Sequence, residues 1–190
     1  LATLHAPYCP VQFLGSVISC LLFVLALTIV FHVAFVYFLP DIIMNYVIYR
    51  IQNDFDVPTN TVYHNEVVNS DTRKVVRPCP DLLYSGMAYD VSERPVRIMA
   101  PVPPSYWSAS FFAINTDNFY VMNDRTVKGG YADVVLVRKN APYPIPKNTT
   151  VVVAPSPRGV ILFRTSIDSP SRIPLLIGYQ KKARAEALDP

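Results

Sequence analysis

The three histidines of this chain have the widest chemical repertoire, because imidazole serves as metal ligand, general base and proton shuttle. They are His5, His32 and His64, and none stands at metal-ligand spacing from another histidine, a cysteine or an acidic residue. The sequence also lacks a nucleophile elbow, a phosphate-binding loop and a dinucleotide fingerprint. We therefore expect no catalytic, cofactor-binding or metal-binding residues and no enzymatic activity. A hydrolase is the least supported class, because no nucleophile–base pair is visible.

His32 differs from the other two because it lies inside a long apolar run, and an ionisable side chain within a membrane is a functional hypothesis by default. Two interpretations remain open. The ring could ligate a pigment or haem, or it could form a hydrogen bond to a neighbouring helix or reach toward the membrane edge. Either interpretation makes His32 a candidate interaction residue.

The element that positions His32 is the apolar run over residues 11–39, which follows a short tail at 1–10. Residues 1–40 contain no Asp, Glu, Lys or Arg, so every charged side chain lies in 41–190. Since about 20 apolar residues cross the hydrocarbon core, the run is long enough to span it with a tilt, and it is too long for a cleaved signal peptide. The sequence predicts a single-pass transmembrane helix. Small residues such as Gly15 and Ser19 are typical of positions where membrane helices pack closely.

Beyond the span, the apolar spacing over residues 40–53 predicts a membrane-proximal helix, and residues 54–80 read as an irregular linker. Arg50 is the only basic residue soon after the span, which is too little to fix the topology from charge. The net charge of +3 is small and dispersed, so we expect no nucleic-acid partner.

From residue 81 to 168 the pattern changes to short runs of Val, Ile, Tyr and Phe separated by turn signals, without helices between them. This pattern predicts a mainly β fold, an antiparallel β-sandwich or small barrel of about seven strands. The last segment, 169–190, is predicted to hold a C-terminal helix over 173–188. The expected strands are 82–90, 95–101, 106–114, 118–123, 132–138, 149–154 and 159–167.

The stretch 106–124, YWSASFFAINTDNFYVMND, is the densest aromatic segment of the chain. Strand alternation places one set of its side chains on a core face: Trp107, Ala109, Phe111 and Ala113. The residues NTD at 115–117 predict a turn, so the segment reads as a hairpin. The opposite face is expected to be exposed and to offer a partner contact through three aromatic residues: Tyr106, Phe112 and Tyr120.

Residues 75–124 carry a set of motifs that resembles an uncharacterised bacterial family, domain of unknown function 1254, a companion of 1214. The resemblance covers roughly 75–165, although Cys79 stands where the family usually has Asn or Ser. It implies a short, membrane-anchored member with one N-terminal span and an extracytoplasmic β domain, periplasmic or, in an organelle, luminal or in the intermembrane space. It implies no established activity. The matching residues are Arg77, Pro78, Asp81, Leu83, Tyr84, Ser85, Asp90, Ser92, Asp117, Asn118 and Phe119.

The span and the aromatic domain together favour a non-catalytic function. We expect an accessory or structural subunit of a larger membrane complex, with the other subunits and the lipid bilayer as its partners. An energy-transducing complex, respiratory or photosynthetic, is the expected host on grounds of bacterial ancestry. The alternative is a membrane-anchored module that binds a lipid, sugar or quinone on the aromatic strand.

Overall fold

The computed structural model describes residues 10–68, 78–139, 146 and 149–188. The chain divides into two compact units, Leu1–Pro40 and Asp41–Pro190, and each is described here by itself. Three features named from the sequence lie outside the described residues: most of the N-terminal tail, His5 within it, and Arg77 of the family motif.

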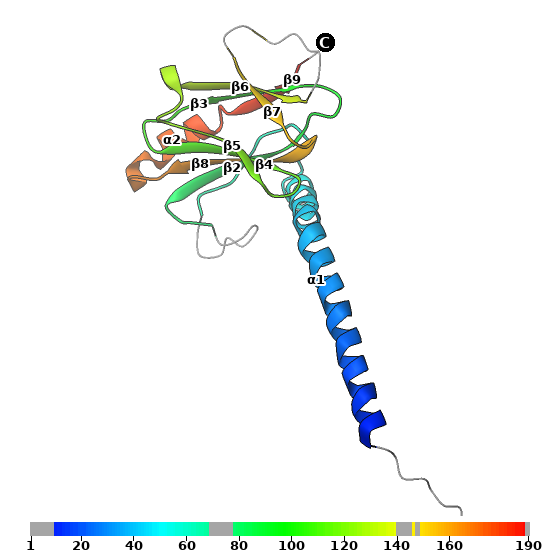
Figure 1. The fold of residues 1–190 in the computed structure, drawn as a ribbon. Coiled ribbons are helices and arrows are strands. Elements are labelled where there is room, and N and C mark those ends of the chain that lie inside the picture. Colours follow the sequence, from blue (N-terminus) through cyan, green and yellow to red (C-terminus); the bar gives the residue numbers. More distant parts are fainter. Residues whose placement is uncertain (1–9, 69–77, 140–145, 147–148, 189–190) are drawn as a thin grey trace, which may run out of the picture. The chain divides into compact units, whose positions relative to one another are not determined.

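The first helix, α1, runs from Pro10 to Asp54, so the predicted span and the predicted membrane-proximal helix form one continuous element (Figure 1). Pro40 lies inside this helix without ending it. A proline inside a helix removes one hydrogen bond and crowds the preceding turn, and membrane-spanning helices tolerate this because other groups satisfy the freed backbone atoms. The portion from Phe13 onward is long and apolar enough to cross a membrane, judged by length and composition.

The strands that follow α1 form two β-sheets, which Figure 1 shows as two layers. The five-stranded sheet has the order β1 (Tyr63–His64), β2 (Leu82–Asp90), β8 (Arg158–Ser166), β4 (Trp107–Ala113), β5 (Asn118–Asn123). The four-stranded sheet has the order β7 (Thr150–Ala154), β6 (Tyr131–Arg138), β3 (Val96–Pro101), β9 (Arg184–Ala187). The helical elements are η1 (Lys128–Gly130), η2 (Pro170–Arg172) and α2 (Ile173–Gln180). All strand pairs are antiparallel except β6 with β7, which confirms a mainly β sandwich.

The main core lies between the inner faces of the two sheets. Phe111, Ile98 and Leu136 are fully enclosed there, and the predicted core face of β4 is confirmed, since Trp107 and its alternate neighbours are buried. Burying such side chains contributes about 1.5–3 kcal/mol each, which is the main source of stability for a sandwich of this size.

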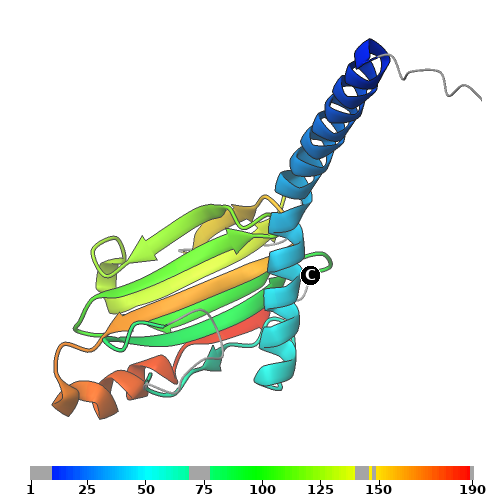
Figure 2. The same cartoon turned by 90° about the horizontal axis from the view of Figure 1, so that it is seen from below.

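A second apolar cluster covers part of the outer face of the five-stranded sheet. Met44, Ile48 and Ile51, one face of the last turns of α1, pack there with Ala88 and Val160. Figure 2 shows this part of α1 crossing the sheet at the end where β8 begins. The 45-residue helix therefore has two different parts. Its side chains are apolar and mostly exposed in the first unit, and in the second unit one face of the helix is buried.

Tyr63 completes the second cluster by lying flat against the sheet. Its ring stacks on Phe55 with 4.2 Å between centroids, and a side-chain carbon added to Gly86 would lie 2.5 Å from its hydroxyl. A glycine is needed at position 86 because β1 pairs Tyr63 directly with it.

The C-terminal segment departs from the prediction. The expected helix over 173–188 ends at Gln180, and Arg184–Ala187 forms the edge strand β9 against β3. The residues RAEA favour a helix by intrinsic propensity. Pairing with β3 overrides that preference, because Ala185 then packs against the main core.

Candidate functional site

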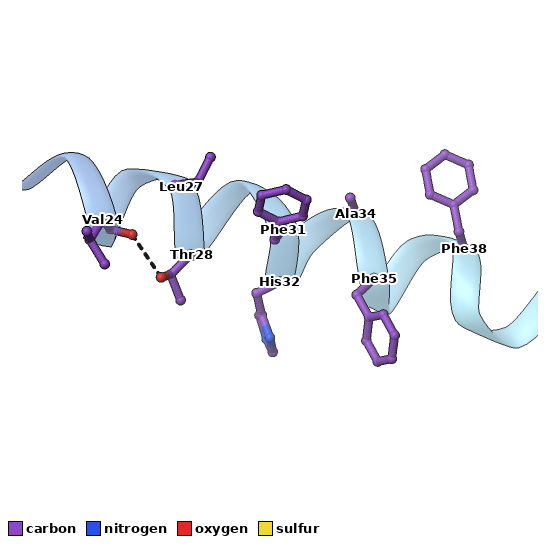
Figure 3. Close-up of a pocket in the computed structure, with 8 residues that line it drawn as sticks. All are labelled: Val24, Leu27, Thr28, Phe31, His32, Ala34, Phe35 and Phe38. Atoms are coloured by element: carbon purple, nitrogen blue, oxygen red, sulfur yellow. Dashed lines mark hydrogen bonds between the residues drawn. The ribbon is translucent and has the colours of Figure 1, made fainter.

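His32 lies on an exposed face of α1, and no described residue forms a hydrogen bond with its ring. Figure 3 shows His32 and Phe35 pointing to the same side of the helix as Thr28, whereas Leu27, Phe31, Ala34 and Phe38 point to the other. The Thr28 hydroxyl donates to the carbonyl oxygen of Val24 at 2.8 Å, so its polar group is satisfied within the helix. Of the two polar side chains on this face, only His32 would need a hydrogen-bond partner outside the helix.

Gly15 and Ser19 lie one turn apart on another side of α1. At roughly 100° per residue, their mean direction is about 140° from that of Thr28 and His32. A side-chain carbon added to Gly15 would meet nothing within 4 Å, so the surface around it is open. The three predicted span residues therefore present two separate faces, one near the start of the helix and one around His32.

The three aromatic residues predicted for an exposed face of the hairpin do not share one face. Tyr106 is 52% exposed, as expected. Tyr120, however, pairs with Phe111 across the hairpin, and its ring lies 5.3 Å from the Phe111 ring on the core side. Phe112 packs against the second cluster. The exposed-face prediction is therefore wrong for Tyr120 and Phe112.

Phe112 does lie on the outer face, but the second cluster covers it. For Tyr120 the reason is the register of the hairpin. Directly paired residues on antiparallel strands point to the same face, so Met122 follows Ala109 into the core. A bulge at Phe111/Phe112 then shifts the pairing, and Phe112 faces Asn118 instead of Phe119. Counting alternation through the turn cannot reveal a bulge.

A small cavity lies at the α2 end of the sandwich. It has a volume of about 10 Å³, and its lining includes Leu83, Trp107, Thr165 and Gln180. A cavity of this size holds at most one water molecule. Within the described ranges, no three His, Cys, Asp or Glu side chains gather in a way that could hold a metal ion.

His64 borders this end of the domain. Its Nδ1 lies 3.0 Å from the Ser85 hydroxyl, and the side-chain amide of Gln180 donates at 2.7 Å to the carbonyl oxygen of Tyr84 nearby. Burial, followed by the positive charge of Lys181, holds the pKa of His64 below its usual value. The neutral ring is therefore the form that this site favours, and its visible function is to join β1 to β2.

The family model described as "Protein of unknown function (DUF1254)" matches residues 59–187, well over half of the chain. The chain belongs to the DUF1254 family. The match begins before and ends after the 75–165 region in which the motifs were recognised. All the strands from β1 to β9 fall inside it. The membrane-type portion of α1 lies outside it.

Two solved structures are similar to this DUF1254 chain. The VPA0106 protein of Vibrio parahaemolyticus matches with a TM-score of 0.65 and 15% identity, over 82% of this chain and 37% of its own length. A protein from Burkholderia cenocepacia matches with a TM-score of 0.46 and 11% identity, over 71% of this chain and 36% of its own. The DUF1254 chain thus spans little more than a third of these structures, and the first likeness shows the fold alone. No curated protein matches the sequence.

One charged side chain of the DUF1254 domain was missed by the sequence analysis. Arg164 lies on β8, the central strand of the five-stranded sheet, and is partly exposed on its outer face. The available signal was its place directly after the apolar run VILF at 160–163, in the middle of a predicted strand. A charged side chain in a central strand loses contact with water, so it is usually paired with an opposite charge or a hydrogen-bonding group.

Proposed function

We propose that this protein is a non-catalytic, single-pass membrane protein that acts as an accessory subunit of a larger membrane complex. Its span is the first part of α1, and its partner there is a transmembrane helix of another subunit. The observation that carries this proposal is His32, a polar ring on the exposed face of an otherwise apolar helix, with no hydrogen-bond partner among the described residues.

The energetic argument concerns the polar nitrogens of that ring. A polar group placed in hydrocarbon without a hydrogen bond costs about 2 kcal/mol or more, and lipid tails offer no partner. His32 lies nine residues before Asp41, the first charged side chain, which is about 13 Å along a helix. A partner helix that presents a hydroxyl, carbonyl or carboxylate group at this depth would remove the cost.

The test is native electrophoresis of the full chain extracted in a mild detergent. The unaltered protein should migrate with its partners, and His32→Leu should weaken that association by removing the hydrogen bond. Val30→Leu is the matched control, since it lies on the far side of the helix, about 160° away. A chain that migrates alone, or an assembly that His32→Leu leaves unchanged, would contradict the proposal.

The β domain is proposed to lie outside the cytoplasm, as the layout of short family members implies. Cys79 provides the test, because it is exposed in the β domain. The test is made in a Cys9→Ser background, because Cys9 precedes the span and would lie on the opposite side of the membrane from Cys79. A membrane-impermeant thiol reagent added to intact cells should label this variant, and the further change Cys79→Ser should remove the label while Cys20 remains. Labelling of the Cys9→Ser variant that appears only after the cells are broken would place the domain on the cytoplasmic side.

An energy-transducing host, respiratory or photosynthetic, is proposed on bacterial ancestry alone, and identification of the co-migrating subunits tests it. The alternative is a module that binds a lipid, sugar or quinone, and it would need a larger pocket than the cavity of about 10 Å³ at the α2 end of the sandwich. Ligands of that kind occupy pockets of roughly 300 Å³ or more.

A further inference from the structure

The outer face of the five-stranded sheet carries a cation, Arg164, that forms no ion pair with any described residue. Arg164 projects from this face because its neighbours Phe163 and Thr165 point into the sandwich and are buried. Its cross-strand partners are Tyr84 on β2 and Ser108 on β4. The covering turns of α1 contact Val160, four residues earlier on the same strand and about 13 Å away.

The hydrogen bonds around Arg164 are incomplete. Its Nη2 donates to the Ser110 hydroxyl at 2.7 Å, while its Nε is enclosed and has no partner. The Ser108 hydroxyl beside it is enclosed as well, also without a partner, in a residue that is only 1% exposed. A buried donor without an acceptor is costly and rare, so two of them at one place call for an explanation.

Two other arginines of the sheets have a carboxylate partner, which Arg164 lacks among the described residues. Arg97 forms a two-pronged pair with Asp133 at 2.9 and 2.6 Å, and Arg158 lies 3.9 Å from Asp90. No carboxylate lies within 4.0 Å of Arg164 in the part of the chain that the structure describes. Arg164 is partly exposed, and Nη1 is the guanidinium nitrogen that is neither bonded to Ser110 nor enclosed. An anion from solution can therefore reach Nη1.

We propose that Arg164, with Ser108 and Ser110, forms an oxyanion-binding site that takes a carboxylate or phosphate group. The planar guanidinium fork matches two oxygens of such a group at once, and the two hydroxyls are donors on the same face. A bound oxyanion supplies the negative charge that no described carboxylate brings within 4.0 Å of Arg164. A modest shift of the Arg164 side chain would also let the Ser108 hydroxyl donate to it.

The experiment measures the thermal unfolding of the full chain in detergent against increasing inorganic phosphate and, separately, acetate. Binding to the folded state raises the Tm with concentration. The unaltered protein should respond to at least one anion, and the stronger response separates a phosphate ligand from a carboxylate ligand. Arg164→Gln should abolish the response, and Arg164→Lys should weaken binding roughly tenfold, because lysine keeps the charge and loses the fork.

Two further variants test whether the anion response comes from this site or from cations elsewhere on the domain. Arg138→Gln removes an exposed cation from the other sheet and should leave the response unchanged. Ser108→Ala should weaken the anion response without lowering the Tm in its absence, because it removes an unpaired hydroxyl. A Tm that neither anion raises, or a rise that Arg164→Gln retains, would overturn the site.

Discussion

Gly159 stands where β8 passes close to two neighbours at once. A side-chain carbon at this position would lie 2.1 Å from the carbonyl oxygen of Phe112 and 2.5 Å from the hydroxyl of Tyr89. The first of these atoms belongs to the backbone of β4, which cannot move without disturbing its pairing with β8. The absence of a side chain is therefore a structural requirement at this point of the sheet.

We expect Gly159→Ala to lower the free energy of unfolding by about 2 kcal/mol or more, as overpacking in a core does. Gly178→Ala is the control, since a side-chain carbon there meets nothing within 4 Å. In helix α2 that change should leave stability unchanged or raise it by about 0.5–1 kcal/mol. Denaturant unfolding of both variants measures the difference, and equal stabilities would show that the strands can separate at low cost.

His64 leads to a prediction about pH. Burial and then Lys181 lower its pKa in the folded state below the ordinary value of 6.5. The unfolded chain therefore binds this proton more tightly, and folding stability falls as the pH drops through about 6.5 toward the folded-state pKa. His64→Gln should flatten this part of the profile, measured as the free energy of unfolding between about pH 8 and about pH 5. If the unaltered protein and His64→Gln lose stability equally as the pH falls, His64 is not the source of the pH dependence.

The residues of the candidate sites differ in how visible they are from sequence. His32 stands out because the run around it contains no charge and few polar groups. Arg164 does not stand out in the sequence, because an arginine in a strand indicates a site only once its cross-strand neighbours are known. Ser108 and Ser110 are brought beside it only by the pairing of β4 with β8, across more than fifty residues of chain.

At the scale of elements, the last turns of α1 act as a cover for the five-stranded sheet. Ile48 is 2% exposed and packs in the second cluster with Ala88 and Val160. Ile48→Ala should lower the free energy of unfolding of the β domain by about 2–4 kcal/mol, because it leaves a cavity over the sheet. Tyr49→Ala, at a neighbouring position that is 60% exposed, is the control and should cost much less. Equal effects would show that this part of α1 does not stabilise the sheet.

The strands were predictable where their side chains alternate, and β2 and β5 begin and end where the pattern indicated. The failures have two physical causes. β9 is an edge strand made of helix-favouring residues, held by pairing with β3. Tyr120 was placed on the wrong face because register depends on the partner strand and on a bulge.

At the scale of the whole molecule, both apolar clusters lie entirely within residues 41–190. The described side chains of 13–33 are exposed and contribute nothing to either cluster. The stability of the β domain should then depend on where the chain is cut within α1. A cut after Pro40 keeps the covering turns, and a cut after Asp54 removes them.

We expect the fragment 41–190 to fold and to unfold at the same denaturant concentration as the domain in the full chain. The fragment 55–190 loses Met44, Ile48 and Ile51 and exposes the apolar face beneath them. At about 1.5–3 kcal/mol for each buried side chain, the loss should exceed about 4 kcal/mol, a large part of the stability of a domain this size. Circular dichroism during urea unfolding measures both fragments. If 55–190 is as stable as 41–190, α1 serves only as an anchor; if 41–190 fails to fold, the first unit is needed for the domain as well.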